Sequence, residues 1–436
     1  MKLFTLATYS LFVGALFAAD DNSFAIKGAT VHTMTGQTIE NGTVLVRNGK
    51  ITGVGKNLAI PKDVKVIDGK GMQVYPGMID AGTEIGLSEV SAVRETVDST
   101  EIGKFNPELT ALTAVNPSSE FIPVTRVSGI TTVATMPQGQ LISGNVSLMH
   151  LDGWTTDEMG IKKAAGLHLT FPSLGGGGGR RGGGPPPDGD AAAAFGGRNS
   201  FTEMKKTHEK EVQELNEFFE SSRRYQQAVA AKAPGFVRDL KFEAMLPVLE
   251  GKEPILITAN RARDIKESIE WATKQKVKMI LIGAVESYKV TKELKAANIP
   301  VILGPTLALP TEEDEGYDGA FTTPLALQKA GIKFAFASLG NQFARNLPFQ
   351  AAQAVAFGLP HDEAMMAMTK NAAEIWGMGE QLGTIEEGKW ADLIITDGDP
   401  LEAKTQLKRL FIKGKPVDLE TKHKKLYDKY LNRPSN

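Results

Sequence analysis

Acidic side chains follow two short apolar runs of the sequence, and they are the first candidates for chemistry. Asp80 and Glu84 lie in YPGMIDAGTEIGL, and Glu286 follows KMILIG. Two carboxyl groups at one cleft can act as general acid and general base if burial moves their pKa values apart. For Asp80, and for Arg126 in PVTRVSG, a structural interpretation is favoured, in which they hold loops through buried hydrogen bonds.

The histidines and cysteines offer little metal-binding or nucleophilic chemistry. The sequence has no cysteine, and no two of its six histidines lie within five positions of each other, so no local pair with zinc-ligand spacing exists. There is no G-x-S-x-G motif, and no glycine run ends in Gly-Lys-Ser/Thr. We expect ordinary strand, loop or helix histidines at His32, His150, His168, His208, His361 and His423.

The middle of the chain alternates between short apolar runs and helix-like stretches. GITTVATM, EPILITAN, KMILIG, IPVILGP and IKFAFAS suit strands that are buried on both faces. Stretches such as ARDIKESIEWATKQK and NLPFQAAQAVAFG follow several of them. Strand–helix repetition over about 300 residues predicts an α/β fold with a parallel barrel.

The two ends of the chain are rich in β-strand signals. Residues 24–74 alternate apolar and polar, with hairpin signals at Asn41-Gly42 and Asn48-Gly49. GTIEEGKWADLIITDGDPL and RLFIKGKPV have the same character near the other end. We expect these pieces to pair into one small sandwich that embraces the barrel.

One insertion interrupts the pattern. Residues 175–197 are so rich in glycine and proline that we expect a loop, either a lid over the barrel mouth or a tolerated surface insertion. The stretch that follows, beginning FTEMKKTHEKEV, predicts a long polar helix packed on the barrel exterior.

The N-terminus has the pattern of a secretory signal peptide. Lys2 precedes an apolar run that ends at Phe17, and Ala18-Ala19 then meet two aspartates. We expect residues 1–19 to be removed and the protein to be exported to a bacterial periplasm, with an uncleaved anchor as the alternative.

The charge balance argues against a nucleic-acid partner. The formal net charge is −2, with 49 basic and 51 acidic side chains. A basic run at Lys422, Lys424, Lys425 and Lys429 also contains Asp428, which favours a solvated terminal helix. We expect no membrane partner once the signal peptide is cleaved.

Several motifs together resemble the amidohydrolase superfamily, most closely its secreted bacterial members related to imidazolonepropionase and dihydroorotase. They are YPGMIDAGTEIGL, NPSSEFIPVTRVSGITTV, PVLEGKEPILITANRARDI and the turn from Gly383 to Leu393, GTIEEGKWADL. The resemblance implies a (β/α)8 barrel (residues 76–380) flanked by a composite β-sandwich (residues 20–75 and 381–436). It also implies one or two zinc-like divalent metals that activate water to hydrolyse non-peptide C–N bonds.

The residues that the resemblance aligns with the metal ligands are not histidines or aspartates. The strand-1 histidine pair falls on Gly82 and Glu84, and the strand-5 histidine falls on Thr258. The strand-6 position falls within residues 282–284, and the strand-8 aspartate within residues 337–341, which contain none. The strand-4 ligand has no clear counterpart. Pocket candidates are therefore Asp80, Glu84, Arg126, Thr258, Asn260 and Glu286.

Three functions remain open from the sequence. The first is a hydrolase of non-peptide C–N bonds with an atypical metal site or none. The second is a non-catalytic barrel that binds a small molecule or pairs with an active relative, and the third is a different metal-free enzyme. Zinc sites ordinarily need at least three protein ligands, so tight metal binding is not expected. Self-association of such barrels is a further expectation.

Overall fold

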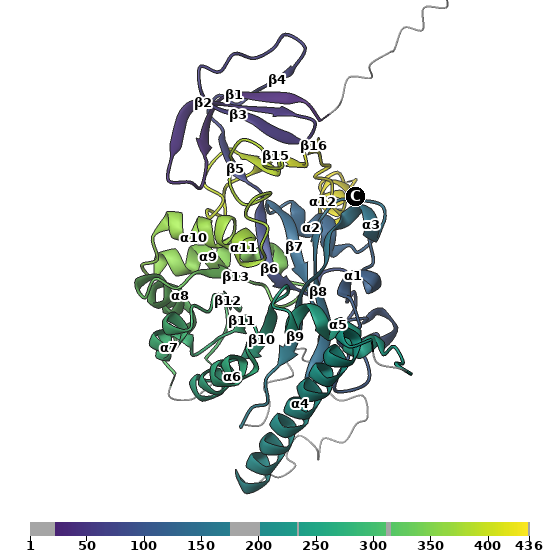
Figure 1. The fold of residues 1–436 in the computed structure, drawn as a ribbon. Coiled ribbons are helices and arrows are strands. Elements are labelled where there is room, and N and C mark those ends of the chain that lie inside the picture. Colours follow the sequence, from purple (N-terminus) through teal and green to yellow (C-terminus); the bar gives the residue numbers. More distant parts are fainter. Residues whose placement is uncertain (1–21, 175–200, 233–234, 311–314, 435–436) are drawn as a thin grey trace, which may run out of the picture.

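A barrel and a composite sheet make up the computed structural model, which describes residues 22–174, 201–232, 235–310 and 315–434 (Figure 1). The expected signal peptide and the insertion at residues 175–197 lie outside the described residues. The α/β class, the barrel and the sandwich built from both ends of the chain are confirmed.

The composite sheet joins the two ends of the chain in the order β16-β15-β14-β5-β1-β2-β3, with β4 beside β1. Its N-terminal strands are β1 (Phe24–His32), β2 (Thr38–Arg47), β3 (Lys50–Lys56), β4 (Lys65–Asp68) and β5 (Gln73–Pro76). Its C-terminal strands are β14 (Leu393–Thr396), β15 (Leu407–Ile412) and β16 (Lys415–Pro416). β5 pairs with β14 in antiparallel fashion, and the Phe24 and Phe411 rings stack at 4.4 Å, so both ends share one core.

The barrel sheet follows the order β6 to β13. Its strands are β6 (Met78–Thr83), β7 (Ile130–Thr135), β8 (Ile142–His150), β9 (Gly160–Thr170), β10 (Ile255–Ala259), β11 (Met279–Gly283), β12 (Val301–Leu303) and β13 (Phe334–Phe336). The two edges meet just beyond β13, where the Leu339 amide donates to the Gly82 carbonyl at 2.9 Å. The barrel is therefore nearly closed.

One strand departs from the strict parallel barrel that the resemblance implies. β8 pairs antiparallel with both β7 and β9, whereas the other neighbouring pairs are parallel. A hairpin connection needs only a few residues, whereas a parallel crossover needs a dozen or more. The short loop between β7 and β8 therefore lies at the carboxyl ends of the parallel strands, and the β8–β9 connection lies at their amino ends.

Side chains alternate between the two faces of the barrel strands, as the two-residue period requires. Ile255, Leu281 and Val301 pack with the surrounding helices, whereas Leu256 and Ile280 belong to a second cluster drawn from all the barrel strands. Because this second cluster contains side chains from all eight barrel strands, it fills the barrel interior. The segment around Trp376 also contributes to it.

Helices cover the barrel and follow most of the parallel strands (Figure 1). They are α1 (Ala111–Ala114), α2 (Phe121–Arg126), α3 (Thr156–Met159), α4 (Phe201–Ala230), α5 (Leu240–Leu249), α6 (Ala262–Gln275), α7 (Thr291–Ala296), α8 (Gly319–Lys329), α9 (Leu347–Ala356), α10 (His361–Ala367), α11 (Lys370–Ile375) and α12 (Lys422–Leu431). Short 3-10 turns lie at η1 (Arg94–Thr96), η3 (Ser287–Lys289) and η4 (Ala344–Asn346). Within the described ranges, no helix combines the length and apolar character that crossing a membrane requires.

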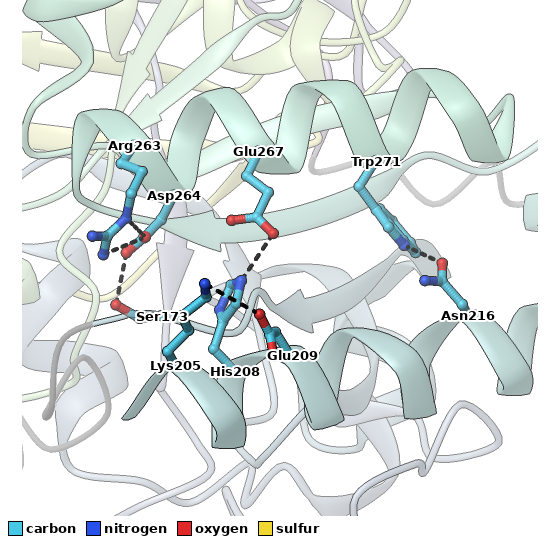
Figure 2. Close-up of polar contacts among 9 residues, drawn as sticks. All are labelled: Ser173, Lys205, His208, Glu209, Asn216, Arg263, Asp264, Glu267 and Trp271. Carbon is cyan, nitrogen blue, oxygen red and sulfur yellow. Dashed lines mark hydrogen bonds and ion pairs between the residues drawn. The ribbon is translucent and has the colours of Figure 1, made fainter. Parts of the chain in front are cut away.

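The long polar helix α4 lies along α6 on the barrel exterior, as predicted (Figure 2). The His208 Nε2 contacts the Glu267 carboxylate at 2.8 Å, and the Trp271 indole donates to Asn216 at 3.0 Å. Phe219 packs edge-on against Trp271 with ring centroids 5.0 Å apart. Buried aromatic packing and these polar contacts together fix α4 to the barrel.

The turn from Gly383 to Leu393 returns the chain to the composite sheet and anchors it to the amino ends of the barrel strands. Gly383 has φ +91°, and a Cβ there would lie 2.8 Å from the Thr369 carbonyl oxygen, so glycine is required. Asp392 is buried; its Oδ2 contacts His150 Nε2 at 2.8 Å, and its Oδ1 accepts from the Lys413 amide at 2.7 Å.

Asp392→Ala should destabilise the fold by about 2–4 kcal/mol, because each buried group that loses its partner costs about 1–3 kcal/mol. Two groups, the His150 imidazole and the Lys413 amide, lose their partner. Urea denaturation followed by circular dichroism measures the change. Asp68→Ala, at an exposed turn, serves as the control; equal losses in both variants would show that the buried contact contributes nothing.

Candidate functional site

The carboxyl ends of the barrel strands form the mouth, where the resemblance places the metal ligands. Gly82 lies at the end of β6, and a Cβ at that position would lie 2.9 Å from Ile282 Cδ1 and 3.4 Å from Ala337 Cβ. Ile282 is on β11, which is not a neighbour of β6 in the sheet, so the two residues meet across the barrel interior. Apolar packing thus occupies the space where a ligand pair would converge.

Leu339 completes this apolar packing from the strand-8 side. A Cβ at Gly82 would lie 3.5 Å from Leu339 Cδ2, and one at Gly304 would lie 2.9 Å from Leu339 Cδ1. Leu339 has φ +50°, a left-handed conformation that costs a non-glycine residue about 1–2 kcal/mol. The hydrogen bond from its backbone amide to the Gly82 carbonyl, together with its side-chain packing, holds Leu339 in this conformation.

His168 is the histidine that lies nearest to the expected ligand positions, and both of its ring nitrogens are occupied. Nδ1 lies 2.7 Å from the Pro137 carbonyl oxygen, which can only accept, so this nitrogen carries the proton. Nε2 therefore accepts from the Thr258 hydroxyl at 2.8 Å. Burial lowers the pKa of His168 to about 4, against the opposing effect of the Pro137 carbonyl. The imidazole is neutral and has no lone pair free for a metal.

Asp80 is fully buried beside Gly82. Its Oδ1 accepts from the Ser338 amide at 3.0 Å and from the Gly82 amide at 3.2 Å. Its Oδ2 is buried and has no hydrogen-bond partner among the described residues. Burial raises the pKa of this carboxyl to about 7, although the hydrogen bonds from Ser338 and Gly82 lower it. Asp80 thus ties the end of β13 to β6 and carries a proton over much of the acidic range.

The remaining candidates divide between the mouth and the opposite end of the barrel. Glu84 is half-buried just after β6, and burial raises the pKa of its carboxyl. Glu286 accepts from the Ala262 amide at 2.7 Å and pairs with Lys289 at 2.6 Å. Burial alone would raise the pKa of Glu286, but these two partners lower it, so this carboxylate supports the start of α6.

Asn260 also has a structural role, since its backbone carbonyl accepts from the Glu286 amide at 2.8 Å. Arg126 does not join the others. It ends α2, ahead of β7, and donates to the Leu151 carbonyl at 3.1 Å and to Asp152 at 3.0 Å. This places its guanidinium at the amino ends of the strands, because β8 runs in the reverse direction and ends there.

The residues at the mouth do not fit a divalent metal. Glycine, isoleucine and leucine occupy positions that would have to supply imidazole or carboxylate donors, and His168 is engaged at both nitrogens. Across the described ranges, histidine, aspartate and glutamate nowhere gather in a group of three or more that could hold a metal ion. Sequence reasoning missed the inward Leu339, for which no local signal exists.

Comparisons with known proteins place the chain among amidohydrolases. A model of the amidohydrolase family matches residues 253–417. The structure of an amidohydrolase from Thermotoga maritima MSB8 aligns with a TM-score of 0.76 and 26% identity, covering 91% of this chain and 99% of that one.

Two curated relatives match over smaller shares of their own length. Amidohydrolase tasK of Hapsidospora irregularis is 21% identical over 394 residues, which covers 83% of this chain and 38% of that protein. Imidazolonepropionase of Thermoplasma volcanium is 41% identical over 88 residues, or 19% of this chain and 22% of that protein. The chain thus spans well under half the length of either relative.

Asp80→Asn should change how stability depends on pH. The pKa of the wild-type carboxyl is about 7 when folded against an ordinary 3.8, so folding takes up a proton and stability falls as pH rises between these values. The asparagine variant has no carboxyl group to titrate. Its free energy of unfolding should therefore rise relative to that of the wild type as pH increases across that window, by at most about 1.4 kcal/mol per pH unit. Urea denaturation from pH 4 to pH 8 measures the difference. The exposed Asp63→Asn should show none, and a pH-independent difference for Asp80→Asn would contradict the assignment.

Gly82→His should destabilise the protein by about 1–3 kcal/mol, because the imidazole overpacks the barrel interior. Ile282→Ala should relieve part of that cost, so the double variant should be more stable than the sum of the single effects by about 1 kcal/mol. Ile280→Ala, on the same strand and in the same interior cluster, is the matched control and should combine additively with Gly82→His. Additivity with Ile282→Ala as well would mean that the two residues do not meet.

Proposed function

Because the chain belongs to the amidohydrolase superfamily, we propose that it is a non-catalytic member that acts as the partner of an active amidohydrolase. The observation that carries the proposal is the apolar contact of Gly82 with Ile282 and Leu339 at the barrel mouth. Function depends on the site and not on the barrel, so a retained fold does not by itself imply retained hydrolysis.

The chemistry of the mouth supports this proposal. Activating water at neutral pH requires a metal held by several inward donors. Glu84 is a single half-buried carboxylate, and Thr258 is engaged with His168. Asp80 is fully buried and bonded to backbone amides, so it does not reach a substrate in this structure. The described residues of the mouth therefore provide a complete set of groups neither for metal-dependent nor for carboxylate-only hydrolysis of a C–N bond.

Exposed apolar side chains in the segments that follow three barrel strands support the partner role. We call these residues the apolar rim; they follow β6, β12 and β13 in the sequence, and these strands are consecutive around the barrel. Its residues are Val90, Val93, Leu307, Leu309, Tyr317 and Phe343, and Leu309 is 84% exposed. Exposed apolar patches of this kind mark interaction sites.

We take the occupant of the apolar rim to be another amidohydrolase, and the length of tasK is compatible with this. The chain covers only 38% of tasK, so this relative has more than half of its length outside the matched barrel. A barrel like this one can therefore occur within a longer chain. We take the partner to be a sibling barrel with an intact strand-1 histidine pair.

The test begins with the chain by itself. Purified protein dialysed against zinc or manganese and analysed by mass spectrometry should hold substoichiometric metal, because inward donors are lacking. It should not hydrolyse dipeptides, hydantoins or lactams. Stoichiometric metal, together with hydrolysis that Glu84→Gln abolishes, would overturn the proposal in favour of an active hydrolase.

The second arm uses a sibling amidohydrolase of the same organism that carries the intact histidine pair. Analytical ultracentrifugation should detect a complex, and the sibling's kcat/KM should change when this chain is added. Leu309→Ser with Phe343→Ser should weaken the complex at least tenfold, since hot-spot apolar contacts contribute about 2 kcal/mol or more each. Val66→Ser with Val237→Ser, equally exposed but outside the apolar rim, is the control. Absence of both a complex and a rate change would refute the partner role.

A further inference from the structure

The helix α12 presents its apolar side to solvent. Leu426, Tyr427, Tyr430 and Leu431 follow the spacing i, i+1, i+4, i+5, which places them on one face of a helix. Tyr427, Tyr430 and Leu431 are 64%, 62% and 66% exposed, and no residue of α12 is buried. An amphipathic helix normally packs its apolar face against the protein. The exposed apolar face of α12 is therefore a candidate for binding a surface outside this chain.

Positive charge borders that face. Five cationic side chains and one carboxylate, Asp428, lie within residues 422–433. At 100° per residue, Lys422 and Lys429 lie beside Leu426 on one edge of the apolar face. Lys424 lies beside Leu431 on the other edge, where it pairs with Asp428. His423 lies within the apolar face, in the first turn of the helix. The cations are Lys422, Lys424, Lys425, Lys429 and Arg433.

The helix is ordered by its own contacts. The Thr421 hydroxyl accepts from the Lys424 amide at 3.1 Å and caps the first turn, and Thr421 is itself buried. Lys424 and Asp428 form an i,i+4 ion pair at 2.9 Å. The helix is thus attached through its amino-terminal cap, and its apolar face remains uncovered.

We propose that α12 binds an anionic phospholipid surface, lying in the plane of the headgroups. A basic helix with a distinct apolar face partitions into this zone, where lysine stems extend along the acyl boundary and their ammonium groups reach the phosphates. Tyrosine suits the same zone because its ring is apolar and its hydroxyl is polar. The proposal departs from the sequence-based expectation of a solvated terminal helix without a membrane partner, which remains an untested prediction.

Charge complementarity selects lipid over a second protein. Lysines on both edges of a narrow apolar face match a uniformly anionic plane, whereas a protein groove would have to supply carboxylates on both sides of an apolar cleft. The proposed attachment is peripheral, because α12 has ten residues, five of them charged, and is too short and too polar to span a bilayer. The proposal is independent of the partner role, since the apolar rim and α12 are separate surfaces.

Sedimentation with vesicles tests the proposal on the full chain. The protein should bind vesicles of phosphatidylcholine containing phosphatidylglycerol at least tenfold more tightly than vesicles of phosphatidylcholine, because each lysine near an anionic surface contributes favourably. Raising salt should reverse the difference. Equal binding to both vesicle types, or to neither, would overturn the proposal.

Two variants separate the apolar and the electrostatic contributions. Tyr427→Ser with Tyr430→Ser and Leu431→Ser should reduce binding to anionic vesicles at least tenfold while leaving the charge unchanged, and Lys425→Gln with Lys429→Gln should flatten the salt dependence. These residues are unburied, so the fold should be unaffected, as circular dichroism will check. Leu309→Ser is the control at an exposed apolar site elsewhere. Concentration-dependent dimerisation that the serine variant abolishes, without vesicle binding, would assign the face to a second copy and refute the lipid proposal.

Discussion

The contact between Gly82 and Ile282 across the barrel interior determines what the mouth of this protein can do. Because residue 82 is glycine, the Ile282 side chain can approach its backbone closely. A Cβ added to Gly82 would lie only 2.9 Å from Ile282 Cδ1. This packing places apolar side chains at positions of the mouth where the resemblance expects metal-binding donors. The left-handed Leu339 shows that packing is strong enough to hold a strained backbone.

The two ends of the barrel have different roles. At the amino ends, Asp392 binds His150 and the Lys413 amide, and the composite sheet closes over them. Barrels of this type generally keep stability determinants at this end and chemistry at the other. Here the stabilising end keeps the turn from Gly383 to Leu393 that resembles the family pattern, whereas the mouth has Gly82 and Thr258 where that pattern has histidines. A family-like fold and a non-family site can therefore coexist in one chain.

Much of this architecture could be predicted because its signals are local. Buried strands such as β10 and β11 are continuous apolar runs, and the missing imidazoles at Gly82 and Thr258 could be read directly. The reversed direction of β8 could not be predicted from the sequence, because apolar patterning does not encode strand direction. The His168–Thr258 bond spans 90 positions and depends on register, so only the folded structure reveals it. Arg126 was grouped with the mouth for the same reason, since its strand end was not known.

The reversal of β8 also bears on how the chain acquires its structure. β7, β8 and β9 form an antiparallel meander within residues 130–170, so their pairing needs only short loops to close. Pairing of low sequence separation carries a smaller entropic cost than the long crossovers of parallel strands. This meander can therefore assemble first and present the β9 edge as a template on which β10 and the later strands add in turn.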